Sequence, residues 1–254
     1  MVSRQAMNVA RLYPEVGAGG FSHVNGTIEF YTRVNALLRP EFTVLDLGAG
    51  RGAQLELEVD SYRTRLARIQ GKVKKLVGID VDHAVLENPF LDEAKVIRIG
   101  EPYPFPDDSF DLIFADWVLE HVDNPLEFAS EVHRVLKPGG WFCARTPNRW
   151  GMVALATSLI PNRAHAPLLA KLQDGRQARD VFPTRYRLNT LGRLRRAFPA
   201  QYWENFSYFS NPEPPYVQRS LLAMRAVQFA WRLAPRYFYT VFNVFIRLKP
   251  THNG

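Results

Sequence analysis

Residues 44–53 read VLDLGAGRGA, an apolar run that breaks into three glycines at Gly48, Gly50 and Gly52. The run predicts a buried strand that enters a tight turn. Gly48, Gly50 and Ala53 also satisfy the dinucleotide fingerprint G-x-G-x-x-G/A. One short turn does not identify a ligand, so further motifs along the chain are needed to distinguish a dinucleotide from another ligand.

Further apolar, β-branched segments follow the first strand and are separated by helical patterns. The predicted strands cover residues 43–50, 74–82, 95–100, 110–117 and 139–146. The clearest helical pattern lies at 125–140, where Pro138 and two glycines end it. Alternating strands and helices predict an α/β fold with a doubly wound, mostly parallel sheet and helices on both faces.

The last part of the chain predicts an antiparallel return to the sheet. Residues 201–209 suit a strand, 215–235 a helix and 237–250 a terminal strand. We therefore expect a mixed seven-stranded sheet whose last strand runs antiparallel. Ligands of such sheets bind at the carboxyl ends of the strands, where Asp46, Asp80, Glu101 and Asp116 are expected.

Composition and charge narrow the class of protein. With 254 residues and 46% hydrophobic residues, the chain suits a single domain, and its one cysteine, Cys143, is expected in a strand and excludes an internal disulfide. The start has no apolar signal segment, and no stretch is long enough to span a membrane, so we expect a cytoplasmic protein. No clustered metal-ligand set is present, and no metal is expected.

The net charge of +7 is unevenly distributed. Residues 1–144 contain 15 Lys and Arg against 21 Asp and Glu, whereas residues 145–254 contain 17 against 4. A basic C-terminal part suits an anionic acceptor, a membrane surface or solvated arginines. Nucleic acid is not expected, because no reader motif is present.

Four motifs then follow one another in order: VLDLGAGRG, GIDVD, YPFPDDSFDLIFADWVLEHVDNP and EVHRVLKPGGWF. Over residues 40–148 they resemble the class I S-adenosylmethionine (SAM)-dependent methyltransferases of the small-molecule type. The resemblance implies SAM as cofactor, with Asp80 on the ribose and Glu101 and Pro102 near the adenine. The implied cofactor-binding residues are Asp46, Gly48, Gly50, Gly52, Asp80, Val81, Glu101, Pro102, Asp116 and Trp117.

The residues agree with this resemblance better than with a dinucleotide. Asp80 lies 28 residues after Gly52, whereas a ribose-binding acid in the dinucleotide motif comes about 20 residues on. SAM has no phosphates, so the turn only has to let the backbone approach the ligand. A nicotinamide-dependent oxidoreductase and a SAM-binding module without turnover stay as alternatives.

We expect O-methylation of a small-molecule or saccharide acceptor, anionic or lipid-linked acceptors included, with N- or C-methylation as the alternative. A hydroxyl acceptor benefits from a general base. The candidates are His121, His165 and Tyr186, with His23 and Asp116 behind them.

The chain is expected to divide into a cap or lid at 1–39, a SAM-binding core at 40–148, an acceptor-side insertion at 149–200 and a strand-helix-strand at 201–254. Arg185 and Arg187 flank Tyr186 and could meet an anionic acceptor. The helix near 216–234, with Arg225 and Arg232 on one face, is expected to pack on the sheet. Contact with the inner face of a membrane stays open for it.

Overall fold

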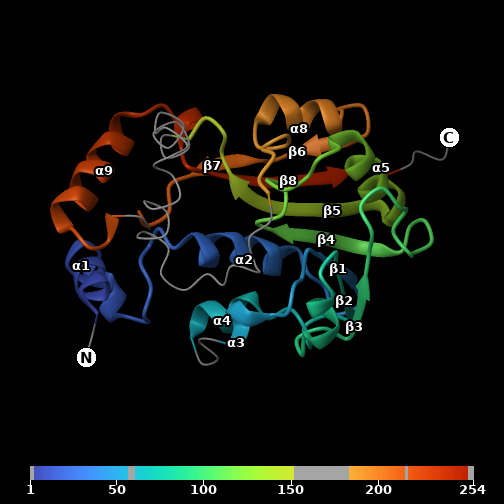
Figure 1. Cartoon of the computed structure of the whole chain (residues 1–254), viewed down its shortest axis with the longest axis horizontal. Helices are drawn as coiled ribbons and strands as arrows, with labels where there is room; N and C mark the ends of the chain where they lie inside the picture. Colours follow the sequence, from blue (N-terminus) through green and yellow to red (C-terminus); the bar gives the residue numbers. More distant parts are fainter. Residues whose placement is uncertain (1–2, 57–60, 152–182, 215–216, 251–254) are drawn as a thin grey trace.

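The computed structural model describes residues 3–56, 61–151, 183–214 and 217–250 (Figure 1). Its strands are β1 Thr43–Leu47, β2 Lys75–Asp80, β3 Glu93–Val96, β4 Phe110–Asp116, β5 Leu136–Pro147, β6 Trp203–Asn205, β7 Tyr208–Ser210 and β8 Val241–Leu248. Within these ranges eight strands form one sheet in the order β3-β2-β1-β4-β5-β8-β6, and β7 also pairs with β8. The pairs among β1 to β5 are parallel, and β8 is antiparallel to β5, β6 and β7.

The predicted doubly wound sheet with an antiparallel last strand is confirmed, but the predicted number of seven strands is wrong. The expected strand at 201–209 is divided into β6 and β7, which both pair with β8. Between them the Phe206 N–H donates to the Phe245 carbonyl at 2.8 Å, and the Ser207 hydroxyl accepts from the Phe245 N–H at 3.2 Å. A side chain here replaces a backbone partner, and this interrupts the ladder.

Helices cover both faces of the sheet. The α-helices are α1 Arg4–Leu12, α2 Gly26–Leu37, α3 Ala53–Glu56, α4 Tyr62–Ala67, α5 Pro125–Val135, α8 Leu191–Ala197 and α9 Leu221–Leu233, and the 3-10 helices are η1 Pro14–Gly17, η2 His83–Glu87 and η5 Arg236–Phe238. In Figure 1, α5 and α8 lie on one face of the sheet, and α2 and α4 lie on the other. The sheet is therefore the middle layer of three.

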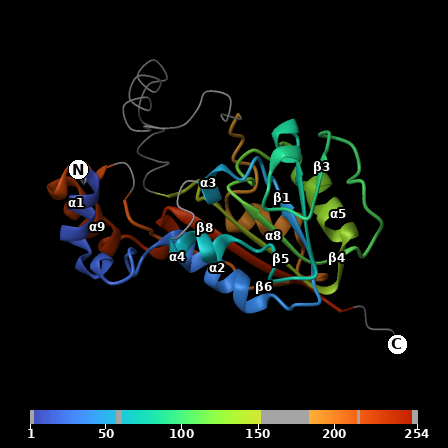
Figure 2. The same cartoon turned by 90° about the horizontal axis from the view of Figure 1, so that it is seen from below.

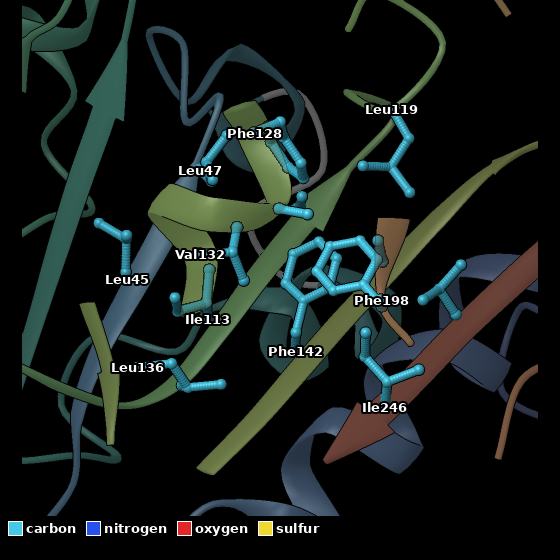
Figure 3. Close-up of a cluster of buried hydrophobic side chains, with 14 of the residues drawn as sticks. Leu45, Leu47, Ile113, Leu119, Phe128, Val132, Leu136, Phe142, Phe198 and Ile246 are labelled. Carbon is cyan, nitrogen blue, oxygen red and sulfur yellow. The ribbon is translucent and has the colours of Figure 1, made fainter. Parts of the chain in front are cut away.

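Alternate residues of the central strands point to opposite faces of the sheet. Leu45, Ile113 and Phe142 lie in one core cluster with α5 residues such as Val132 (Figure 3). Their neighbours along the strands are buried in a second cluster on the other face, against α2: Val44, Leu112, Phe114 and Cys143. Burial on both faces explains why these strands are continuous apolar runs.

Two predicted boundaries moved. The helix expected to end at Pro138 ends earlier, at Val135, because Leu136 already pairs with Phe110 and begins β5. The third strand, expected at 95–100, is β3, which ends at Val96. The acid expected beside its end, Glu101, therefore lies farther along the following loop.

Helix α9 packs chiefly against α1, so the expectation that it packs on the sheet is wrong. The Asn8 amide donates to the Gln218 carbonyl, and the Gln228 amide donates to the Tyr13 hydroxyl, both at 2.8 Å. Figure 2 shows α1 and α9 together at one end of the molecule, beside the N-terminus. No helix in the described part of the chain is long and apolar enough to cross a membrane.

Candidate active site

The glycine turn after β1 has a backbone that only glycine adopts easily. Gly48, Gly50 and Gly52 have φ angles of +78°, +51° and +76°. A Cβ added at Gly52 would lie 2.6 Å from Asn88 Oδ1, and one added at Gly48 would overlap a Val118 methyl group. A side chain would be strained at all three positions, and at Gly48 and Gly52 it would also collide with its neighbours. The turn therefore brings bare backbone to the carboxyl edge of the sheet.

Asp80, the last residue of β2, holds this turn in place. Its Oδ2 accepts from the Gly50 N–H and its Oδ1 accepts from the Asp82 N–H, both at 2.9 Å. Each carboxylate oxygen has a second lone pair. Asp80 can thus brace the turn and still accept hydrogen bonds from a ligand.

Asn88 is a contributor to this turn that the sequence did not reveal. Its buried amide donates to the carbonyls of Ala49 and Gly50 at 3.2 and 3.1 Å. Its own oxygen accepts from the Phe90 N–H at 3.0 Å. An asparagine in the loop after η2 carries no motif, so only the fold shows what it contacts.

Asp116 ends β4 in a buried ion pair with Arg145, which lies opposite it in β5. The guanidinium makes two hydrogen bonds to the carboxylate, Nε to Oδ1 and, at 2.8 Å, Nη2 to Oδ2. The Tyr31 hydroxyl also donates to Oδ2 at 3.2 Å, and Thr27 accepts from Arg145 at 3.1 Å. Two residues of α2 thus meet the ends of β4 and β5.

Trp117, which follows Asp116, has a φ of +60°. A positive φ is uncommon outside glycine and costs about 1 kcal/mol or more. Its N–H donates to the Arg145 carbonyl at 3.0 Å, and the Arg145 guanidinium lies 5.3 Å from its ring centroid. Asp108 and Tyr186 also have positive φ angles, of +52° each, so the cofactor contact expected for Trp117 stays a prediction.

Asp46 completes a row of three acids at the carboxyl edge, on the neighbouring strands β2, β1 and β4. Among the described residues its carboxyl group accepts no hydrogen bond. Burial raises the pKa of the Asp46 carboxyl well above its usual range, and the charges of Asp116 and Asp80 raise it further. A cation bound here would relieve this repulsion, whereas a pyrophosphate would add to it.

A buried polar chain lies beyond this row. The Thr146 hydroxyl donates to Glu120 Oε2 at 2.8 Å and accepts from the Asn189 amide at 2.6 Å. Burial raises the pKa of Glu120, although the bond from Thr146 opposes this. These residues join the turn after β4, the end of β5 and the segment before α8.

The structure brings two of the predicted bases to the same turn. His121 Nδ1 lies 3.1 Å from the Pro183 carbonyl, and the Tyr186 N–H donates to the Glu120 carbonyl at 3.1 Å. A carbonyl only accepts, so Nδ1 carries the hydrogen in this contact and Nε2 carries the lone pair of the neutral ring. His165, the third candidate, lies outside the described residues.

The remaining predicted residues are more exposed. Glu101 is exposed and pairs with Arg98 at 3.5 Å, and Pro102 beside it is also exposed. Val81 follows Asp80 and is 37% exposed. In the described part of the chain, no hydrogen bond or ion pair joins the side chains of these three residues to the acid row.

Asp123 lies beside the arginines that were expected to meet an anionic acceptor. It lies 3.8 Å from Arg185 and 3.2 Å from Arg187, and all three side chains are about half exposed. Part of their positive charge is therefore already balanced.

His23 lies elsewhere. It is 71% exposed, pairs with Glu15 at 2.7 Å and lines a groove of about 460 Å³ on the outer side of α2. None of the residues that line this groove belongs to the glycine turn. His23 is thus poorly placed to act as the base.

Comparison with known proteins agrees with this geometry. The family model of a methyltransferase domain matches residues 45–144. A protein of Mycolicibacterium smegmatis named "Probable S-adenosylmethionine-dependent methyltransferase" is 35% identical over 109 residues, which are 42% of this chain and 38% of that protein. A demethylmenaquinone methyltransferase of Symbiobacterium thermophilum is 31% identical over 114 residues, 41% of this chain and 42% of that protein.

Solved structures show the same fold over more of the chain. A SAM-dependent methyltransferase from Methanosarcina mazei matches with a TM-score of 0.53 at 18% identity, over 86% of this chain and 97% of that one. The curated relatives above are each matched over about two fifths of their length. The matched segment includes the glycine turn, Asp80 and Asp116, and the family implies SAM as cofactor. The chain therefore carries a class I S-adenosylmethionine-dependent methyltransferase domain.

Proposed function

We propose that this protein transfers a methyl group from SAM to a hydroxyl oxygen of a small molecule or saccharide. When bound, SAM supplies a methyl group already activated on a sulfonium, so the protein mainly has to align a nucleophile. The observation that carries the proposal is the row of Asp80, Asp46 and Asp116 beside a bare glycine turn. This row suits a cationic nucleoside without phosphates.

The residues of the row have different roles in this proposal. Asp80 accepts the ribose hydroxyls, and the backbone at Gly48 and Gly50 lies against the methionyl part. Asp46, whose carboxyl has no hydrogen-bond donor in the described chain, faces the positive charge of the ligand. Asp116 already binds Arg145 and Tyr31, so we assign it to the wall of the site rather than to proton transfer.

We assign the general base to His121. The contact of its Nδ1 with the Pro183 carbonyl leaves the lone pair of the neutral ring on Nε2. Nε2 would accept the hydroxyl proton as the oxygen takes the methyl group, the carbon–sulfur bond breaks and the sulfur leaves as the neutral thioether. Tyr186 lies on the segment bound to the same turn, and we place it on the acceptor side with Arg185 and Arg187.

We also propose that the N-terminal segment 1–39 caps the cofactor site. Tyr31 and Thr27 reach Asp116 and Arg145 from α2. The Phe21 ring stacks on Tyr62, whose helix follows the glycine turn, with centroids 5.4 Å apart. These contacts support a cap that is packed in place.

The second candidate is a carbon acceptor, because a relative of Laribacter hongkongensis, 31% identical over 117 residues, is named as a C-methyltransferase of ubiquinone and menaquinone biosynthesis. Carbon and oxygen acceptors are both compatible with one scaffold, since the cofactor site is shared. The acceptor side must distinguish them. His121 is the residue whose loss should separate the two.

The test uses SAM with a labelled methyl group and matched panels of hydroxylated and quinol acceptors. We expect transfer to a hydroxyl, and His121→Gln to lower kcat about 100-fold and to flatten its pH profile. His23→Gln, an exposed histidine, serves as control and should leave kcat unchanged. Calorimetry with S-adenosylhomocysteine (SAH) and with NADH checks the cofactor: NADH uptake without SAH binding would refute the proposal, and SAH binding without transfer would indicate a binding module.

A further inference from the structure

Helix α9 has apolar side chains on two opposite faces. Met224 and Trp231 are buried, and the neighbouring Gln228 binds Tyr13 after α1. The outer stripe consists of Leu222, Phe229 and Leu233, which are 79%, 64% and 72% exposed. Their spacing of seven and four residues puts them on one side of the helix. In the described structure this stripe is not used for packing within the chain.

Positive charge borders this stripe. Arg225 and Arg232 lie on one flank of it by helical spacing and are exposed, and Arg219 and Arg236 lie just beyond the two ends of α9. The sequence from 217 to 250 contains no Asp or Glu. Helix α1, which packs on α9, adds Arg4 but no acid. A partner that covers the stripe therefore meets positive charge along α9 and at both of its ends.

We propose that the outer face of α9 docks on a bilayer that contains anionic lipids. Leu222, Phe229 and Leu233 insert at the level of the headgroups, and Arg225 and Arg232 lie against lipid phosphates. Tyr237 and Phe238, 43% and 36% exposed, follow in η5 and supply the amphipathic rings that favour this interface.

Charge favours a lipid surface over a second copy of the chain. A two-fold dimer would bring the same face of α9 onto itself. Arg225 and Arg232 would then approach their own copies, and like charges repel. Anionic headgroups instead complement the arginines while the apolar stripe leaves water. This inference does not depend on the proposed methyl transfer.

The experiment is flotation of the full chain with vesicles of phosphatidylcholine alone or mixed with phosphatidylglycerol. We expect binding to the mixed vesicles at low salt, and its loss at about 0.5 M salt, where charges are screened over about 3 to 5 Å. Absence of binding to the mixed vesicles at low salt would overturn the proposal.

Variants locate the surface. Phe229→Ser and Leu233→Ser should each weaken partitioning about tenfold, and Arg225→Gln and Arg232→Gln each about fivefold. Two matched controls change exposed side chains on other helices: Leu126→Ser on α5, where the side chain is 63% exposed, and Arg195→Gln on α8. Both variants should bind vesicles as the wild type does. Thermal melts check that every variant is folded.

Two results with the same variants would contradict docking on a bilayer. If the controls lose binding and the α9 variants keep it, the surface lies elsewhere and the proposal is wrong. Sedimentation velocity gives a further outcome. A concentration-dependent dimer that Phe229→Ser abolishes, in a protein that does not float with vesicles, would assign the stripe to a second copy.

Discussion

Replacing Asp80 by Asn tests the proposed cofactor site most directly. The Asp80 carboxylate accepts one backbone N–H on each oxygen, from Gly50 and from Asp82. An amide has only one acceptor oxygen, so its NH₂ group would face one of these donors. The substitution also removes a negative charge from the end of β2. Both the turn and the ribose contact should therefore weaken.

The size of each effect follows from the bonds that are lost. A hydrogen bond to a charged group contributes about 1.5–3 kcal/mol. Losing one between Asp80 and the turn should lower the melting temperature by roughly 5 °C in a domain of this size. Losing one to the ribose should weaken SAH binding about 10- to 150-fold.

The assay is calorimetry with SAH, run well below the melting temperature of the variant. Asp92→Asn is the matched control. Asp92 accepts from the Leu76 N–H at 2.7 Å and from the Gln70 amide at 3.2 Å, at the opposite end of β2. We expect it to lower stability while leaving SAH affinity unchanged. Equal SAH affinities for wild type and Asp80→Asn would refute the assignment of Asp80.

Four further predictions concern the turn, the ion pair, the acid row and the buried thiol. Gly48→Ala, at a φ of +78°, should displace the turn and lower SAH affinity at least about tenfold by calorimetry. Arg145→Met should cost about 3–5 kcal/mol in thermal or denaturant unfolding, because it leaves a buried carboxylate, and adding Asp116→Asn should recover part of that loss. Burial raises the folded-state pKa of Asp46, so the folded protein binds more protons than the unfolded chain. Its stability therefore falls as the pH rises through the range between the ordinary and the raised pKa. Asp46→Asn should raise the melting temperature of the apo protein at neutral pH, and this benefit should disappear at about pH 4. The same substitution should weaken binding of SAM more than binding of SAH, because only SAM has the positively charged sulfur. Burial also raises the pKa of Cys143, so a thiol reagent should react with it only slowly in the folded protein and rapidly in denaturant; fast labelling of the folded protein would contradict its placement in the core.

The cofactor side of the site could be read from the sequence because its signals are local. A strand, a turn that needs positive φ and an acid at the next strand end are adjacent in the chain or ordered along it. Asp46, Asp80 and Asp116 lie at the carboxyl edge as expected, since parallel strands put their ends together. The acceptor side could not be read in this way. Tyr186 lies 65 residues after His121 in the sequence. Only hydrogen bonds in the folded chain bring the two segments together, from His121 to the Pro183 carbonyl and from the Tyr186 N–H to the Glu120 carbonyl.

By itself, the sequence determined a parallel sheet that is buried on both faces, because continuous apolar strands must be covered by helices on both sides. It also determined the turn at the carboxyl edge of the sheet, because the positive φ angles of that turn favour glycine. Only the tertiary structure decided that Arg145 neutralises Asp116, that Asn88 holds the turn and that α9 packs on α1 with an apolar stripe outward. The physical reason is the same in each case. Hydrogen bonds, ion pairs and burial depend on which distant segments of the chain come into contact. Composition and periodicity describe only local sequence, so they do not predict these contacts.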